Sequence, residues 1–582
     1  MKKRILALAA ASALIFPLSG TAAAAPPDIT PIIVVAGFTS TRLYANPGSP
    51  DRVKVWDDAM EGVTDALLGE LPGLLGGSLL WMFMGCTTVV SRAFERAVRS
   101  VMGQFAMGPD GRPAHDVGPY PGTVEDFSYA AIQRNAPEIG QLDAICRRFA
   151  NTVSQDGVFV FQYDWRNSTL ESVRQLREFI QEVKWFTDSS TVRLFGESYG
   201  GQVCAVYLSE YAGEGDVTKA VLEIPALGGT SLLPELIRDK NFHINVGDAL
   251  GMAMAYGEME GMPGFGFLQW LIPQFLIARL GSTLVMEGLL PNMITWGNLW
   301  DLIPPDAYEE TKASMLASGG QAVWEADSDR LHREILPNIG AALQGMEEEY
   351  GVAVRIIACT GKRLAFGKER INSDGLLDVN RSTGAIVLPL GDHGLAQGGA
   401  VCGDPEHRHL SPGRDIDASA AWLPENTWFV QGTFHGTGER DPYLLGLETA
   451  LMLDTGFNTV HDREEYPQFG LSRHPNEDIY AQFTMSPPGF VGEKDAALRI
   501  DNLTKTQKVK ILSVCAPQGG LRFQMDQTTL DPGQALRVPV SGGTLAGSGS
   551  YMPVTVTYQL TAAGKKLSLP VIKSKTFDIS VW

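Results

Sequence analysis

The sequence predicts an α/β protein with a mostly parallel sheet, followed by a separate all-β domain at the C-terminus. Short apolar runs recur at long intervals up to about residue 430, and helical patterns lie between several of them. Strands that alternate with helices indicate a parallel sheet covered by helices on both faces. From residue 489 onward, short alternating runs are separated by turns rich in Gly, Pro and Asp, which is typical of an antiparallel β-sandwich.

Length and composition agree with this organisation. The chain has 582 residues, enough for about two to four domains. Hydrophobic residues make up 44% of it, so large cores can form. Acidic residues outnumber basic ones by 66 to 47, and a net charge of −19 argues against nucleic acid as a partner.

The first 24 residues are predicted to be a signal peptide. A basic start, Met1–Arg4, precedes the apolar stretch Ile5–Leu18 and the small residues Thr21–Ala25. Cleavage after Ala24 leaves a protein that we expect to be secreted or periplasmic. The remaining chain divides into a larger α/β domain at 25–485 and a β-sandwich at 486–582.

The predicted central strands are rich in β-branched or aromatic residues, and lie at 31–36, 158–163, 192–195, 220–224, 352–358 and 427–430. Ser168 and Glu171 form a capping-box pattern before a helical apolar stripe that ends near Val183. A second helical face follows Ser198. The predicted strands of the C-terminal domain lie at 497–500, 508–514, 535–540, 554–560 and 577–581.

Two large insertions, at about 57–125 and 231–345, interrupt this pattern and are predicted to form a lid or cap. Each contains a long uncharged stretch, at 71–91 and 261–278, that Pro, Gly or polar residues interrupt. We therefore expect apolar surface rather than membrane-spanning helices.

The motif that carries chemistry is Gly196-Glu197-Ser198-Tyr199-Gly200. It follows a predicted strand and precedes a helix, which is the setting of a nucleophile elbow. Ser198 is the predicted nucleophile, and an α/β-hydrolase fold places the acid and the histidine after it in the chain.

Asp374 is the predicted acid, because it lies in a loop shortly after the strand at 352–358; Asp378 and Asp392 are its rivals. His435 is the predicted base, because it follows the strand at 427–430 in a glycine-flanked loop, with His393 as the runner-up.

Gly37–Ser40 follows the first strand, where a hydrolase places its first oxyanion donor. The backbone N–H groups of Phe38 and Tyr199 are therefore the predicted oxyanion hole.

Five segments together resemble the lecithin:cholesterol acyltransferase-like family of α/β-hydrolases, which includes lysosomal phospholipase A2. They are residues 34–43, 54–56, 163–166, 196–201 and 289–304. Tyr163-Asp164-Trp165-Arg166 is the most specific of them. The resemblance covers about residues 30–450 and implies a Ser-Asp-His triad, an acyl-enzyme, and release of the acyl group to water or an alcohol. Only part of the family's acid motif is present, at Ser373–Leu377.

The expected function is that of an exported serine hydrolase or O-acyltransferase acting on acyl esters such as phospholipids or other lipids. The expected partners are the lipid or acyl-ester substrate and a lipid interface that the lid contacts transiently. An esterase or depolymerase for non-lipid esters and a catalytically inactive surface-binding scaffold are the alternatives. No cofactor is expected.

Two further groups of residues carry no predicted site. Of the six cysteines, Cys204 and Cys359 are expected to be buried thiols, and a full disulfide framework is not favoured. Residues 402–409 contain metal-capable side chains, namely Asp404, Glu406, His407 and His409. Adjacent ligands in one loop rarely complete a coordination shell without distant partners, so no metal is predicted.

Overall fold

The computed structural model describes three long stretches of the chain, 30–56, 101–238 and 284–581. Within them, short gaps fall at 136–137, 393, 397–401, 403–406, 412, 437, 439–440, 473–477, 484–496, 503, 505–506, 517–520, 533, 542–549 and 563–570. The predicted signal peptide, both uncharged stretches and much of the two insertions lie outside the described residues. Among the described residues, no helix combines the length and the apolar character needed to cross a bilayer.

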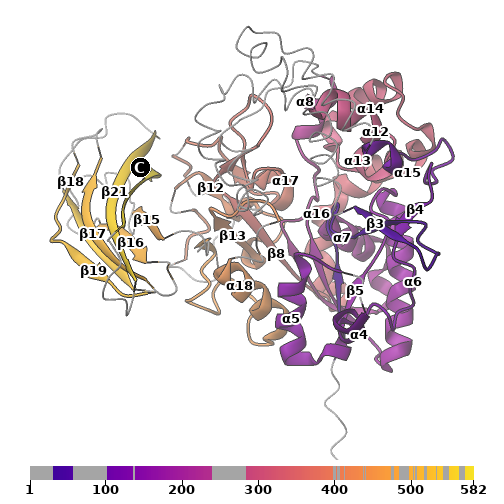
Figure 1. The fold of residues 1–582 in the computed structure, drawn as a ribbon, viewed down its shortest axis with the longest axis horizontal. Coiled ribbons are helices and arrows are strands. Elements are labelled where there is room, and N and C mark those ends of the chain that lie inside the picture. Colours follow the sequence, from indigo (N-terminus) through magenta and orange to yellow (C-terminus); the bar gives the residue numbers. More distant parts are fainter. Residues whose placement is uncertain are drawn as a thin grey trace, which may run out of the picture.

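A seven-stranded parallel sheet forms the centre of the larger domain (Figure 1). In spatial order its strands are β14 (Phe469–Leu471), β13 (Thr427–Gln431), β8 (Ala353–Thr360), β7 (Val217–Glu223), β6 (Val192–Glu197), β1 (Ile32–Val35) and β5 (Val158–Phe161). Every neighbouring pair is parallel. All six predicted central strands are confirmed, and β14 is an additional edge strand.

Helices cover both faces of this sheet. On one face α5 (Leu142–Val153) packs against α18 (Pro442–Leu453), and α4 (Tyr129–Asn135) lies beside α5. On the other face α7 (Tyr199–Tyr211) packs between α6 (Thr169–Thr187) and α16 (Ile339–Tyr350). The Ser168 hydroxyl accepts a hydrogen bond from the Glu171 N–H at 3.2 Å, so the predicted cap at the start of α6 is confirmed.

The order of the strands defines where a site can form. The chain runs from β1 to β5 on one side and then to β6 on the other, so the direction of winding reverses at β1. The carboxyl ends of parallel strands beside such a reversal are the usual place of a ligand site. This topology, with a nucleophile-elbow turn after β6, is that of an α/β-hydrolase, as predicted.

Burial explains why these segments read as continuous apolar runs. All four residues of β1 and of β5 are buried, because helices cover both faces of a parallel sheet. Cys204 and Cys359 lie in this core as predicted.

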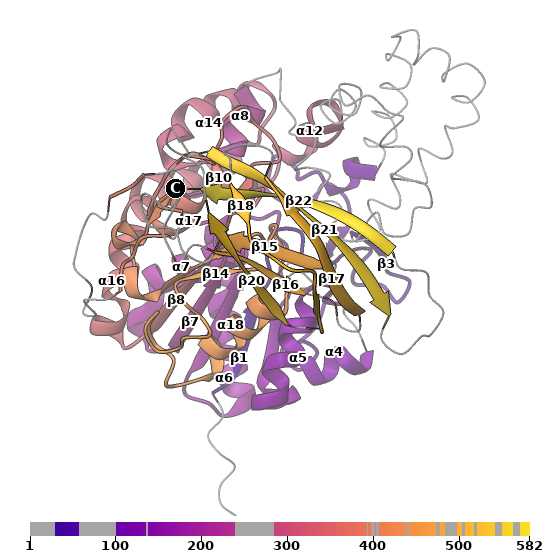
Figure 2. The ribbon, with the colours of Figure 1, turned by 90° about the vertical axis from the view of Figure 1, so that its left-hand side faces the viewer.

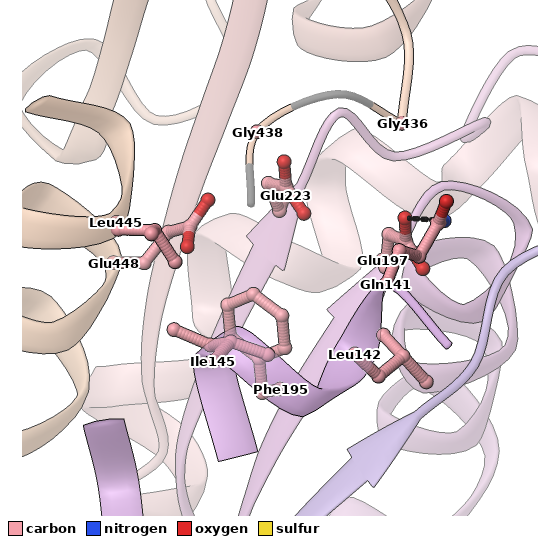
Figure 3. A pocket seen from close by; sticks show the side chains of 10 residues that line it. All are labelled: Gln141, Leu142, Ile145, Phe195, Glu197, Glu223, Gly436, Gly438, Leu445 and Glu448. Carbon is pink, nitrogen blue, oxygen red and sulfur yellow. Dashed lines mark hydrogen bonds between the residues drawn. The ribbon is translucent and has the colours of Figure 1, made fainter. Parts of the chain in front are cut away.

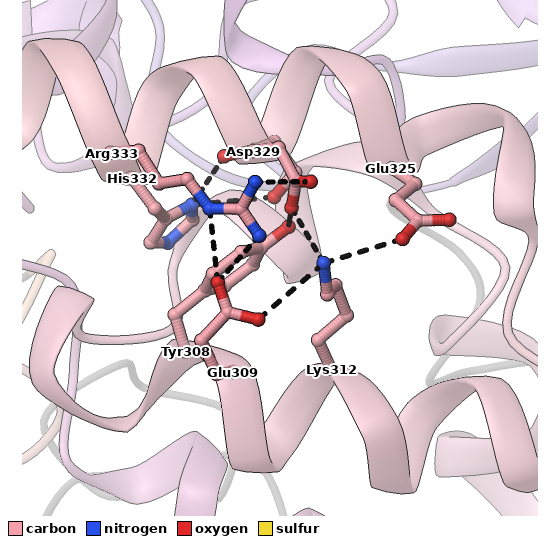
Figure 4. Close-up of polar contacts among 8 residues, drawn as sticks. Tyr308, Glu309, Lys312, Glu325, Asp329, His332 and Arg333 are labelled. Atoms are coloured by element: carbon pink, nitrogen blue, oxygen red, sulfur yellow. Dashed lines mark hydrogen bonds and ion pairs between the residues drawn. The ribbon is translucent and has the colours of Figure 1, made fainter.

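The described part of the second insertion is helical. It contains α8 (Leu232–Arg238), α12 (Leu290–Met293), α13 (Gly297–Asp301), α14 (Tyr308–Ala317) and α15 (Glu325–Arg330). A network of charges joins α14 to α15 and to the turn of helix that follows it (Figure 4). Lys312 Nζ lies 2.8 Å from Asp329 Oδ1, and Arg333 bonds both Glu309 and Asp329.

Smaller antiparallel sheets complete the larger domain. They are formed by β2 (Leu43–Ala45), β3 (Val53–Trp56) and β4 (Val117–Pro119), by β9 (Lys362–Arg363) and β10 (Asn372–Ser373), and by β11 (Ile386–Val387) and β12 (Ile416–Asp417). The short helix α17 (Val379–Thr383) lies between the last two pairs in the chain.

The C-terminal region forms two four-stranded antiparallel sheets, which lie in front of the larger domain in Figure 2. One contains β15 (Ile479–Phe483), β16 (Ala497–Asn502), β20 (Ala535–Ser541) and β18 (Arg522–Phe523), and the other β19 (Thr528–Leu530), β17 (Gln507–Cys515), β21 (Ser550–Ala562) and β22 (Val571–Val581). Their buried residues form a core of their own, as the predicted all-β domain requires. The first strand, β15, begins before the expected boundary at residue 486.

Candidate active site

Ser198 lies on a sharp turn between β6 and α7. Its backbone has φ 56° and ψ −119°, a strained conformation for a residue other than glycine. Glycines make the turn sterically accessible: a Cβ on Gly200 would lie 2.2 Å from the carbonyl oxygen of Val35, and one on Gly196 would lie 2.7 Å from the carbonyl oxygen of Gly200. The strand, the turn and the helix therefore hold the serine hydroxyl at the carboxyl edge of the sheet.

Three predicted residues meet at this edge. Ser198 Oγ lies 2.8 Å from His435 Nε2, and His435 Nδ1 lies 2.8 Å from Asp374 Oδ2. They come from loops after β6, β13 and β8, and the carboxyl ends of parallel strands share one edge. All three side chains are buried. This arrangement allows the imidazole to accept the serine proton while the carboxylate holds the opposite ring nitrogen.

The loop around Asp374 fixes the carboxylate in place. Its Oδ1 accepts hydrogen bonds from the N–H groups of Leu376 and Leu377 at 2.9 and 2.8 Å. Its backbone carbonyl accepts one from the N–H of His435 at 2.8 Å, which ties the acid loop to the histidine loop. Both the orientation of the carboxylate and the position of the imidazole are therefore set by backbone contacts.

The rival acids lie in other contacts. Asp378 Oδ2 accepts a hydrogen bond from the N–H of Ser231 at 2.8 Å. Asp392 forms an ion pair with Arg370 at 2.9 Å. His393, the alternative base, lies outside the described residues.

The backbone N–H groups of Phe38 and Tyr199 are the predicted oxyanion donors. Tyr199 is the first residue of α7, so its N–H has no acceptor within the helix. Phe38 lies three residues after the end of β1. Among the described residues, neither amide donates to another backbone group outside helices and strands. The N–H of Ser198, in contrast, donates to the carbonyl of Glu223 at 2.8 Å.

The segment Tyr163–Arg166 packs against the loop that contains Phe38 and forms hydrogen bonds with it. The Tyr163 hydroxyl donates to the carbonyl of Ala36 at 2.7 Å, and Trp165 Nε1 donates to that of Thr41 at 3.0 Å. The Phe38 ring contacts the Trp165 ring edge-on, with centroids 5.2 Å apart. These contacts fix the loop on both sides of the predicted oxyanion donor.

Arg166 and Asp164 secure this segment in turn. The guanidinium is fully buried and forms a bidentate pair with the Asp164 carboxylate at 2.8 and 2.6 Å. It also donates to the carbonyls of Phe105 and Val117. A buried pair with all these bonds satisfied fixes the geometry of the surrounding loops.

Behind the triad lies a small cavity of about 20 Å³, lined by carboxyl groups and by apolar side chains such as Leu142 and Phe195. Glu197, Glu223 and Glu448 contribute side chains to it, and Figure 3 shows Glu223 between Glu448 on the left and Glu197 on the right. Gly436, next to His435, lines the same cavity. Three buried carboxyl groups therefore surround the base of the histidine loop.

Each carboxyl group has a distinct environment. Glu197 Oε1 accepts from Gln141 Nε2 at 2.6 Å, and its Oε2 lies 3.4 Å from the Ser40 hydroxyl. Burial raises the pKa of Glu197, although His435 and these donors favour its charged form. Burial also raises the pKa of Glu223 and of Glu448, and repulsion between neighbouring carboxyl groups adds to it. The charge of Glu448 contributes to the raised pKa of Glu223, so the two carboxyl groups titrate as a pair.

The imidazole responds to these charges. Burial lowers the pKa of His435, but the charge of Asp374, its hydrogen bond and the charge of Glu197 raise it, and the net pKa lies above its usual value of 6.5. The site therefore favours a positive charge on the ring that takes the serine proton.

Sequence reasoning missed the three glutamates. A signal was present, since Glu448 is the one charged residue of α18 and Glu223 ends an apolar strand. A charged residue on a buried face requires a partner, but the sequence does not say which. The one group of metal-capable side chains found among the described residues lies elsewhere, at the start of β13.

No protein-family model and no curated protein matches the chain. Among solved structures, it is similar to proline iminopeptidase from Mycobacterium smegmatis, with 12% identity over 54% of this chain and 85% of that chain and a TM-score of 0.21. A lipase-esterase related protein from Clostridium acetobutylicum gives 12% identity over 33% and 87%, with a TM-score of 0.15.

A meta-cleavage product hydrolase from Pseudomonas fluorescens IP01 gives 12% identity over 38% of this chain and 66% of that chain, less than two thirds of its length, with a TM-score of 0.16. Likenesses of this strength carry no argument about function. The assignment of the fold depends on the sheet topology and on the turn at Ser198.

Proposed function

We propose that the protein is a serine hydrolase of acyl esters that works through an acyl-enzyme. The observation that carries the proposal is the chain of contacts from Ser198 Oγ through His435 to Asp374, with both distances at 2.8 Å. A strained serine, a base within hydrogen-bond reach and a carboxylate behind the base are the parts that nucleophilic acyl transfer needs.

In the proposed mechanism, Ser198 Oγ attacks the ester carbonyl while His435 Nε2 takes the hydroxyl proton. Asp374 holds the imidazole in the required tautomer and stabilises the imidazolium. The amides of Phe38 and Tyr199 donate to the developing oxyanion. His435 then protonates the leaving alcohol. A water or a second alcohol attacks the acyl-enzyme while the same nitrogen takes its proton, and His435 then returns that proton to Ser198 Oγ as the acyl product leaves.

The proposed substrate class is lipid. The support is the resemblance of five sequence segments to the lecithin:cholesterol acyltransferase-like family and the uncharged stretches at 71–91 and 261–278 within the two insertions. Met and Trp are abundant in the second insertion, and such residues suit a pocket for flexible chains or a lipid interface. Transfer of the acyl group to an alcohol and export by the signal peptide belong to the same proposal.

The first experiment is intact-mass analysis after reaction with a fluorophosphonate, which labels only an activated serine. We expect one adduct on the wild-type protein. We also expect one on the control variant Ser318→Ala, which keeps Ser198 and changes an exposed serine. We expect none on Ser198→Ala. Absence of an adduct on the folded wild type would reject the proposal.

A second experiment tests the substrate class. Hydrolysis of a soluble short-chain ester is compared with that of dispersed long-chain phospholipid, with and without a long-chain alcohol. We expect higher activity on the dispersed lipid, and a new ester in the presence of the alcohol. Activity on the soluble ester alone would support the non-lipid esterase instead.

A further inference from the structure

Four side chains with metal-ligand atoms converge at the start of β13. They are Cys402, His409, Glu425 and His461, and one ligand atom from each lies within 4.8 Å of all the others. Glu425 belongs to the short helix η10 (Pro424–Asn426), directly before β13, and His461 follows α18. His435 lies beyond the other end of β13, and a five-residue strand is roughly 17 Å long, so this cluster is separate from the triad.

We propose that these four residues form a structural zinc site. The distances fit a tetrahedral ion. Cys402 Sγ lies 3.1 Å from His461 Nε2, and Glu425 Oε1 lies 4.0 Å from each of these atoms. Usual zinc–sulfur, zinc–nitrogen and zinc–oxygen bond lengths place tetrahedral ligand atoms about 3.3 to 3.6 Å apart. Changes of about half an ångström would bring these three separations into that range, and the ligand atom of His409 lies within 4.8 Å of the other three.

A buried glutamine fixes the tautomer of the neutral His409 ring. Gln468 Nε2 donates to the carbonyls of Pro424 and Thr427 at 2.7 and 3.1 Å, so the amide oxygen must be an acceptor. That oxygen lies 2.9 Å from His409 Nδ1. Nδ1 therefore carries the proton, and Nε2 carries the lone pair that a metal requires.

This arrangement matches the outer contacts of known metal sites, in which a ligating histidine donates its other nitrogen to a fixed acceptor. Gln468 is buried, with 1% of its surface exposed. It also bonds His407 Nε2 at 3.1 Å, and the His407 ring lies 4.5 Å from the His461 ring. His407 is thus a neighbour of the site that packs against two ligands.

Charge and ligand type select the metal. A thiolate and a carboxylate supply two negative charges, which neutralise one dication, while the two imidazoles are neutral. Sulfur and nitrogen ligands favour zinc over magnesium or calcium, which prefer oxygen. On binding, the Cys402 thiol releases its proton to solvent as the sulfur–metal bond forms, and nothing is oxidised or reduced.

A hydrogen-bonded thiol–imidazole pair does not account for the whole cluster. It explains the contact between Cys402 and His461, but not why Glu425 and His409 converge on the same point. The sequence did not predict a metal here, because Cys402 and His409 lie in one loop and their partners are far along the chain. The structure supplies those distant partners, Glu425 and His461.

The ion would join Cys402 and His409 to the start of β13 and to the turn that leads from α18 to the edge strand β14, which local structure does not connect. Four protein ligands leave no position for substrate, which is the pattern of a structural site. Its expected role is to hold the edge of the central sheet.

The test is metal analysis of the full-length protein purified without chelators. We expect about one equivalent of zinc in the wild type. Cobalt substitution should give a thiolate-to-metal absorption band and the visible bands of a tetrahedral ion. Cys402→Ser and His461→Gln should lose the zinc and the thiolate band. Cys515→Ser and His115→Gln, which change exposed residues, should keep both.

A measurement on the wild type covers the case in which these variants do not fold. The rate of Cys402 alkylation is mapped by mass spectrometry before and after removal of metal by a chelator. We expect chelation to raise it about tenfold or more, and to leave Cys515 unchanged. A wild type that takes up no zinc, a Cys402→Ser variant that keeps it, or an alkylation rate insensitive to chelation would overturn the proposal.

Discussion

Replacing Asp374 by Asn tests the proposed triad at the point where the structure constrains it most. Two backbone N–H groups, those of Leu376 and Leu377, point at Oδ1. An asparagine has one acceptor oxygen, so these donors would claim it and turn the amide nitrogen toward His435 Nδ1. The ring would then have to accept at Nδ1 and carry its proton on Nε2, which faces Ser198 Oγ.

A histidine protonated on Nε2 cannot take the serine proton. Loss of the correct tautomer, with the geometry otherwise retained, reduces kcat by about 10⁴-fold in serine hydrolases of this kind. At 1.36 kcal/mol for each factor of ten, the transition state loses about 5.5 kcal/mol of stabilisation. Because the oxyanion donors remain, the residual rate should still exceed that of the reaction in water.

The assay is the turnover of a soluble short-chain nitrophenyl ester, together with the rate of fluorophosphonate labelling. The matched control is Asp378→Asn. Asp378 is a second buried aspartate a few residues after Asp374, and its carboxylate contacts Ser231 rather than the histidine. We expect the control to stay within about tenfold of the wild type. A folded Asp374→Asn protein with a similarly small loss would refute the reasoning.

Three further predictions follow from the same site. The acid limb of kcat/KM should titrate above pH 6.5, because activity needs neutral His435 and the pKa of His435 is raised. Glu197→Gln removes a negative charge near the ring and should move that limb to lower pH. An unmoved profile would show that Glu197 does not raise the pKa of His435. Glu448 has a raised pKa in the folded state, so its contribution to stability is complete below about pH 4.5 and is lost as the pH rises through the folded value. The wild type should therefore lose stability relative to Glu448→Gln between pH 5 and 8, by at most about 1.4 kcal/mol per pH unit, and parallel Tm values across that range would contradict this. Gly200→Ala would place a methyl group 2.2 Å from a carbonyl oxygen of β1, and should lower the free energy of denaturant unfolding by more than about 2 kcal/mol. The control Gly48→Ala, with open space around it, should match the wild type. Equal unfolding midpoints for the two variants would show that the turn relaxes.

The sequence was most informative where structure is local. The strand before Ser198, the two flanking glycines and the helix after it are contiguous in the chain, so one pattern contains the whole turn. The parallel strands were predicted for a similar reason, because burial on both faces leaves a continuous apolar run. β14 pairs over only three residues, which is too short to give such a pattern.

Residues that meet only through the fold were harder to assign. Asp374 and Asp378 follow the same strand, and nothing in the sequence says which of them the backbone of the loop turns toward His435. Glu223 lies on the strand β7 and Glu448 on the helix α18, which are far apart in the sequence and pack against each other in the fold. Sequence patterns identify each buried charge as unusual, but its partner depends on packing.

The carboxyl groups behind the histidine loop present an apparent conflict, since burying three acids destabilises a fold. The conflict is reduced because burial and neighbouring carboxyl groups raise the pKa of Glu223 and of Glu448, which favours their uncharged forms. Glu197 receives a hydrogen bond from Gln141 and lies beside the Ser40 hydroxyl. What remains is a negative field around a histidine that must become cationic when it takes the serine proton. That negative field destabilises the fold while His435 is neutral. When the ring becomes positively charged, its attraction to the carboxylates offsets this cost. The residues that weaken the resting fold would therefore favour the transition state over the ground state.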